Sequence, residues 1–179
     1  MLLVTAVVLS AGLAMGSGQT WSERTTLQFN EPVMVPGKTL QPGTYVFQLM
    51  DSETNRHHVQ ILNDDGETVT TTMAIPTKRP QAKGDVVIKF NPTEKGVPPA
   101  VAAYFYPGSI YGHEFVYPEE QAKQIAQRTK KVVLSRDVAG TDLEAGTLQV
   151  FDASGMAKPY TEDPDAAPSW QKWQGERTS

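Results

Sequence analysis

The residues best suited to chemistry lie in the stretch YFYPGSIYGHEFVYPEEQA, residues 104–122. Half of the chain's tyrosines and phenylalanines fall between positions 104 and 117, together with His113, one of only three histidines, and Glu114 beside it. Aromatic faces can stack on sugars or anchor an interface, and an imidazole beside a carboxylate can bind a metal or move a proton. The stretch therefore suggests a binding site, a metal or catalytic site, or the dense core of a β protein.

A metal site would combine His113 and Glu114 with one of the other two histidines, His57 or His58. The segment begins like the zinc-protease motif H-E-x-x-H, but its fifth residue is Tyr117, and its pattern predicts a strand rather than a helix. Neighbours on a strand point to opposite faces, so at most one of His57 and His58 can join His113. We expect no cofactor and no metal, and a metal-binding protein or hydrolase using these residues is the alternative.

Other catalytic signatures are missing from the sequence. It contains no G-x-S-x-G elbow and no cysteine for thiol chemistry, and its Gly-Ser-Gly at 16–18 does not connect a strand to a helix. The paired acids Asp64 and Asp65 precede Gly66 and are explained by a turn. We predict no catalytic residues and a protein that is not an enzyme.

The binding interpretation depends on which aromatic side chains face outward. Alternation places Tyr104 and Tyr106 on one side of their strand and Phe105 on the other. With Phe105 inward, the tyrosines form a partly exposed strip near the loop 108–112. In the other register they point into the core, where each buried ring contributes on the order of 2 kcal/mol, and we favour that register. The candidate ligand-binding residues are Tyr104, Tyr106, Tyr111, His113, Glu114 and His57.

Short alternating segments separated by turn residues predict a mainly β fold for residues 24–136. Thr25 to Phe29 alternate, Pro42-Gly43 forms a turn, and the loop Asn63 to Gly66 joins a hairpin. The period changes once, in PEEQAKQIAQRTKK, which places small and apolar residues on one face of a short helix near 118–131. Seven or eight short strands favour an antiparallel β-sandwich, Ig-like or prealbumin-like, with this one helix.

The two ends of the chain differ from this middle part. Residues 1–18 are apolar as far as about Met15 and then small, which is typical of a signal peptide. Residues 137–179 are rich in proline and acid, apart from Trp170 and Trp173, and we expect a largely flexible C-terminal extension. The predicted organisation is a signal peptide, a β-sandwich domain over 24–136, and this extension.

Composition and charge indicate where the protein works. Charged residues make up 20% and hydrophobic residues 39% of the chain, an ordinary soluble composition. The net charge of −4 gives no overall attraction to nucleic acid. The chain has no cysteine, so the core must stabilise the fold without disulfides. We expect a secreted, periplasmic or cell-surface protein that does not span the membrane once the signal peptide is cleaved.

Three blocks of the sequence resemble an uncharacterised family of small exported bacterial β-sandwich proteins. The blocks are a G-T-Y strand entry in LQPGTYVFQLMD, an N-R-H-x-V-Q-I strand in NRHHVQIL, and a G-x-E-F-V-Y-P segment in GHEFVYP. The resemblance covers roughly residues 27–130. It implies export and the sandwich fold, and it carries no activity.

Together these features predict an exported, non-catalytic β-sandwich that acts as a binding or structural module of the cell envelope or extracellular space. Its partner would be a cell-envelope protein, a glycan or copies of itself. A second alternative is a self-assembling surface or filament subunit, because residues 25–35 could pair as an edge strand with a neighbouring copy. Pro32 and Pro36 oppose that pairing.

Overall fold

The computed structural model describes residues 24–50, 58–94, 96–137 and 146–161, and the predicted signal peptide and His57 lie outside them. In chain order the elements are β1 (Arg24–Phe29), β2 (Val33–Val35), β3 (Lys38–Leu40), β4 (Gly43–Leu49), β5 (His58–Leu62), β6 (Thr68–Lys78), β7 (Val87–Asn91), β8 (Ala100–Phe105), β9 (Tyr111–Phe115), β10 (Tyr117–Pro118), α1 (Glu119–Thr129), β11 (Val133–Arg136), β12 (Leu148–Phe151) and β13 (Ala157–Pro159). The predicted mainly β class with one short helix is confirmed for these residues.

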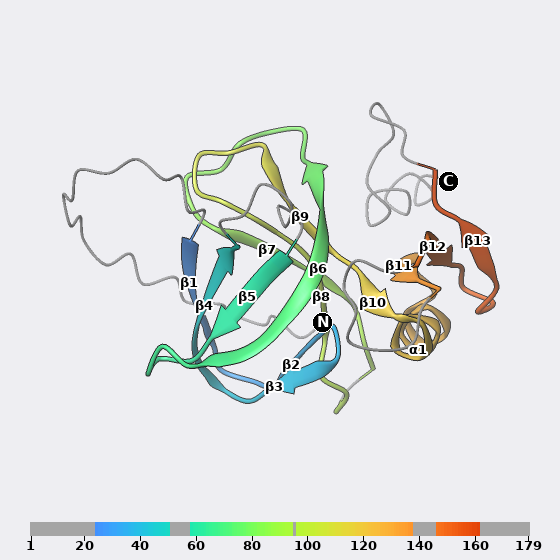
Figure 1. Cartoon of the computed structure of the whole chain (residues 1–179), viewed down its shortest axis with the longest axis horizontal. Coiled ribbons are helices and arrows are strands. Elements are labelled where there is room, and N and C mark those ends of the chain that lie inside the picture. The colour runs from blue at the N-terminus through green and yellow to red at the C-terminus, as the bar shows by residue number, and fades with distance from the viewer. Residues whose placement is uncertain (1–23, 51–57, 95, 138–145, 162–179) are drawn as a thin grey trace.

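Nine strands form one large sheet in the order β1-β4-β5-β6-β9-β8-β2-β3, with β7 paired to β8. Strands β1 and β2 lie far apart in this order, yet only residues 30–32 connect them. The sheet therefore curls on itself around a common core, as Figure 1 shows. The pair β2–β8 is parallel, so the sheet is mixed rather than purely antiparallel, and the sandwich arrangement stays a prediction.

A second sheet, ordered β10-β11-β12-β13, lies beside the large one together with α1 (Figure 1). Its last two strands belong to residues 137–179, for which the sequence suggested a largely flexible extension. Strand β12 pairs with β11 along its full length and buries Phe151, which explains why this part of the extension is ordered. Residues 138–145 and 162–179, with Trp170 and Trp173, lie outside the described residues.

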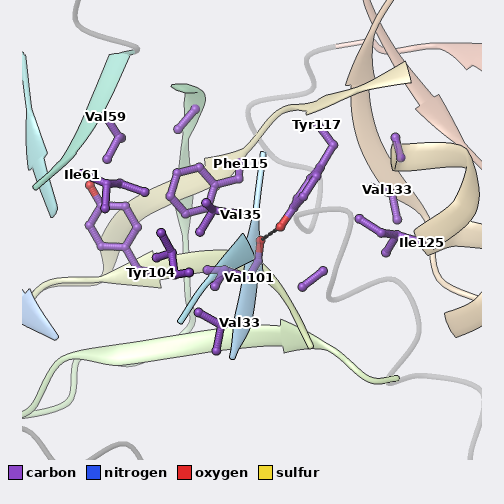
Figure 2. Packing of buried hydrophobic residues seen from close by; sticks show 14 of the residues in the cluster. Val33, Val35, Val59, Ile61, Val101, Tyr104, Phe115, Tyr117, Ile125 and Val133 are labelled. Carbon is purple, nitrogen blue, oxygen red and sulfur yellow. Dashed lines mark hydrogen bonds between the residues drawn. The ribbon is translucent and has the colours of Figure 1, made fainter. Parts of the chain in front are cut away.

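One hydrophobic core joins the two sheets and the helix. Tyr104 and Phe115 meet Val59 and Ile61 inside the curled sheet, as Figure 2 shows. Strand β8 is buried at every position, so it packs on both of its faces. Aromatic residues of this segment thus contribute to the core, as we favoured from the sequence, with rings at edge-to-face angles such as Phe47 against Tyr104.

Tyr117 links the second sheet to the large one. Its hydroxyl lies 2.7 Å from the carbonyl oxygen of Val101 on β8 and 3.1 Å from that of Met34 on β2, and Figure 2 shows the shorter contact. Full burial raises the pKa of the Tyr117 hydroxyl well above its usual value. The neutral phenol thus satisfies carbonyls of two strands at the centre of the molecule.

The helix forms where the sequence predicted it and packs by its small residues. Ala122, Ile125 and Ala126 are buried, while Glu119 and Glu120 lie in the first turn, where the helix dipole favours negative charge. Among the described residues no helix is long and apolar enough to cross a membrane.

Segment 25–35, the predicted self-assembly edge, is divided between two strands. Strand β1 pairs with β4 over six positions, and β2 pairs with β3 and makes one bridge to β8. Part of this backbone is therefore used within the chain. Strand β1 is the first in the sheet order and its other edge pairs with no strand among the described residues, so self-assembly stays a prediction.

Candidate functional site

The candidate site is the connection between β8 and β9, residues 106–110, which we call the β8–β9 loop. Phe105 pairs with Gly112 at its base. The Ser109 amide donates to the Tyr106 carbonyl at 3.3 Å, and the Tyr111 amide donates to the Ser109 hydroxyl at 2.9 Å. Gly108 adopts a φ of 70°, a conformation that favours glycine. The turn that the sequence placed at Pro107-Gly108 is thus present and internally bonded.

Arg79, the residue after β6, holds this loop from the side. Its backbone amide donates to the Ile110 carbonyl at 2.8 Å. Its side chain donates twice to the Ser109 carbonyl, from Nε at 3.0 Å and Nη2 at 2.7 Å, and Nη2 also lies 3.4 Å from the Tyr106 carbonyl. Arg79 therefore holds the loop through both its side chain and its backbone amide.

The Arg79 guanidinium is unusually buried for a cation. Only 6% of the residue is exposed, and the guanidinium carbon lies 5.1 Å from the centre of the Phe105 ring. Desolvation lowers the pKa of Arg79. Its Nε and Nη2 atoms meet carbonyl oxygens and its plane lies near the Phe105 ring, while Nη1 is buried without a hydrogen-bond partner among the described residues. A side chain held this firmly is suited to positioning a loop.

The side chains presented at the end of the loop are apolar. Tyr111 is 64% exposed and Ile110 is 37% exposed, and the only other large hydrophobic residue this open in the described part of the chain is Met156. We call Ile110 and Tyr111 the apolar tip. Contiguous exposed apolar patches can mark interaction sites, and the apolar tip is a small patch of this kind.

Two lysines lie beside the apolar tip. Lys78 is the cross-strand partner of Tyr111, so the two side chains share a face of the sheet. The carbonyl of Lys83 accepts a hydrogen bond from the Gly108 amide at 2.7 Å, which places the exposed Lys83 beside the loop. Burial lowers the pKa of Lys89, and the charges of Lys83 and Arg79 lower it further. The tip therefore lies in a local basic region of an acidic protein.

The exposed tyrosine strip, the alternative to the favoured inward register, does not form, because its members separate. Tyr104 is fully buried, with its ring centre 5.5 Å from that of Tyr106 and its hydroxyl 3.2 Å from the Tyr106 hydroxyl. Tyr106 is partly buried against the core, and Tyr111 is the exposed member. Of the candidate binding tyrosines, only Tyr111 is therefore open to a partner.

His113 and Glu114 are both buried but on opposite faces of β9. The His113 ring lies inside the curled sheet, 5.4 Å from the Tyr104 ring and 5.7 Å from the Tyr106 ring. Glu114 lines a cavity of about 10 Å³ with Asn91, which is room for roughly one water molecule. The two side chains therefore point into different surroundings and do not act on one ligand.

The pairing of the strands also separates His113 from His58. On β6, His58 is opposite Met73 and His113 is opposite Pro76, three residues further along. Positions an odd number apart on a strand face opposite sides, so His58 and His113 lie on different faces of the sheet. The described residues contain no group of three or more His, Asp or Glu side chains that could hold a metal ion.

Comparisons with other proteins give no further guide to the site. No protein-family model, curated protein or solved structure matches the chain. Arg79, Lys78 and Lys83 were not among the site residues predicted from the sequence. They are recognised from the pairing of β6 with β9 and from the contacts of the loop. The sequence carried one signal for them, an arginine directly after the long strand that ends at Lys78.

Proposed function

We propose that the protein is an exported, non-catalytic binding module of the cell envelope or extracellular space, and that it binds through the apolar tip. One observation carries the proposal. Arg79 fixes the β8–β9 loop by two hydrogen bonds to Ser109, while the loop leaves Tyr111 64% exposed. A protein that fixes a loop and leaves its apolar side chains in water is prepared for contact with something else.

Preorganisation supports this proposal. Ordering a loop on binding costs free energy, and a loop that is already ordered avoids much of that cost. Tyrosine provides a large contact area with few rotatable bonds, which makes it a common anchor of binding surfaces. The tip is small, so we expect a modest interface anchored by Tyr111 and extended by polar contacts.

Export is supported by the sequence alone. Residues 1–18 have the apolar and small-residue pattern of a signal peptide. The resemblance to small exported bacterial proteins points the same way.

The proposal is tested by measuring how much of the full chain binds to isolated bacterial envelope fragments. The test variant is Ile110→Ser with Tyr111→Ser, and the control is Met156→Ser, which removes an equally open hydrophobic side chain from another hairpin. We expect the double variant to lose about tenfold in affinity or more and the control to bind like the wild type. Equal binding by the double variant, or no binding by the wild type, would refute the proposal.

A further inference from the structure

We infer that the apolar tip docks on an anionic phospholipid surface, with Ile110 and Tyr111 entering the interface and the neighbouring lysines contacting headgroup phosphates. This inference rests on the proposed function and names the partner of the same loop. It is drawn from the combination of apolar and basic side chains at one place.

The apolar tip has the chemistry of a membrane interface. Tyrosine is amphipathic and is enriched where apolar and aqueous regions meet, with its ring in the apolar part and its hydroxyl near water. Ile110 precedes it and is also exposed. Because the hydrogen bonds of Ser109 to Arg79 hold the loop, both side chains stay outward and do not fold back onto the protein.

The basic surroundings supply the complementary charge. Lys78 lies across from Tyr111, and Lys83 lies beside Gly108. Among the described residues, Asp85 is exposed in the connection before β7, and Glu114 is buried on the face of β9 opposite to Tyr111. Lysines close to an anionic membrane each add to binding.

The lysines beside the tip contrast with the charge of the whole chain. The chain as a whole carries a net charge of −4, so attraction to an anionic membrane is confined to this region and would orient the molecule.

A lipid surface fits the tip better than a protein or a neutral sugar does. A stable protein interface buries roughly 800 Å² on each partner, and two adjacent side chains supply only a small part of that. A neutral sugar would use Tyr111 but not the lysines. A membrane needs no complementary pocket, and a few apolar side chains with several cations are enough for reversible attachment.

The experiment is flotation of the full chain with vesicles of phosphatidylcholine alone and of phosphatidylcholine with about one quarter phosphatidylglycerol. We expect binding to the anionic vesicles only, and weakening by about 0.5 M salt. Ile110→Ser with Tyr111→Ser should lower binding about tenfold or more, and so should Lys78→Gln with Lys83→Gln.

Two controls match these variants. Met156→Ser removes an exposed hydrophobic side chain elsewhere, and Lys123→Gln with Arg128→Gln removes two charges from the exposed side of α1. Both should bind like the wild type. Soluble glycerol phosphate should not displace the protein, since the bilayer itself is required.

The remaining outcomes separate this inference from the proposed function. Wild-type binding to envelope fragments without binding to anionic vesicles would overturn the lipid surface and leave a protein or glycan as the partner. Displacement by glycerol phosphate would also overturn it in favour of a phosphate site. An equal loss of vesicle binding in all four variants would overturn the assignment of the membrane-binding surface to the apolar tip.

Discussion

The guanidinium of Arg79 donates two hydrogen bonds to a single carbonyl oxygen, that of Ser109, from Nε at 3.0 Å and Nη2 at 2.7 Å. This relationship joins the end of β6 to the β8–β9 loop, thirty residues further along the chain. Because these hydrogen bonds hold the loop, Ile110 and Tyr111 are exposed on a segment of defined conformation.

Replacing Arg79 by lysine should release the loop. Lysine has no planar fork and cannot donate twice to Ser109 while covering the Phe105 ring. We expect the free energy of unfolding to fall by about 2–4 kcal/mol, because a buried charge loses its hydrogen bonds. Urea denaturation measures this, and amide exchange at Ser109 and Tyr111 should become faster.

The control for Arg79→Lys is Lys83→Gln, because the Lys83 side chain is exposed. It should change stability by no more than about 0.5 kcal/mol. If Arg79→Lys leaves both the denaturation midpoint and the two amide exchange rates unchanged, the loop is not held by Arg79.

Gly112→Ala should disrupt the base of the same hairpin. A Cβ atom at this position would overlap the Tyr104 carbonyl oxygen and lie 2.5 Å from Cδ1 of Phe105. Neither the backbone nor a fully buried ring can move easily, so we expect a loss of about 3 kcal/mol in the free energy of unfolding. Gly84→Ala is the control, since its Cβ would meet open space. Equal stability of the two variants would contradict the observed strand pairing.

Tyr117→Phe should weaken the joint between the two sheets by about 1–2 kcal/mol, because the carbonyls of Val101 and Met34 lose a buried donor. The raised pKa of Tyr117 adds a pH dependence. The unfolded phenol ionises near pH 10 while the folded one stays neutral, so this contribution is present below about pH 10 and is lost as the pH rises further. Urea denaturation of both proteins at about pH 8 and pH 10.5 should show the difference shrinking. A constant difference would contradict the burial of this hydroxyl.

Asp152→Asn should loosen the β12–β13 hairpin. Its carboxylate accepts hydrogen bonds from the amides of Ser154 and Met156 and pairs with Lys158 at 2.9 Å. Hydrogen bonds from Ser154 and Lys158 hold the pKa of Asp152 well below its usual value. The stabilisation is therefore present above about pH 4 and is lost only as the pH falls below that value. Nuclear Overhauser contacts between the two strands should persist at pH 4 in the wild type and weaken in the variant at neutral pH, and unchanged contacts in the variant would contradict this role.

Much of the fold could be predicted because local patterns decide it. Alternation in Thr25 to Phe29 gives a strand that buries every second residue, and the spacing of Ala122, Ile125 and Ala126 gives the helix. The face that each side chain occupies was harder to predict. Strand β8 is buried on both faces, so alternation could not show whether Tyr104 or Phe105 points into the curled sheet.

The features that could not be predicted depend on contacts between segments that are distant in the sequence. His58 and His113 lie on opposite faces because of their registers against β6. This information is not present in the sequence of any one segment. The role of Arg79 requires the loop at Ser109 to lie beside the end of β6, and an isolated arginine in the sequence is most often a solvated charge. The second sheet was missed in part because β13 has no buried residue and is held by its pairing with β12.

The central claim is that the apolar tip is the binding surface, and the most direct measurement compares three forms of the full chain on bacterial envelope fragments. These are the wild type, Ile110→Ser with Tyr111→Ser, and Met156→Ser. The predicted result is equal binding by the wild type and by Met156→Ser, with a loss of about tenfold or more in the affinity of the tip variant. Indistinguishable binding curves for all three, with the tip variant folded by circular dichroism, would contradict the claim.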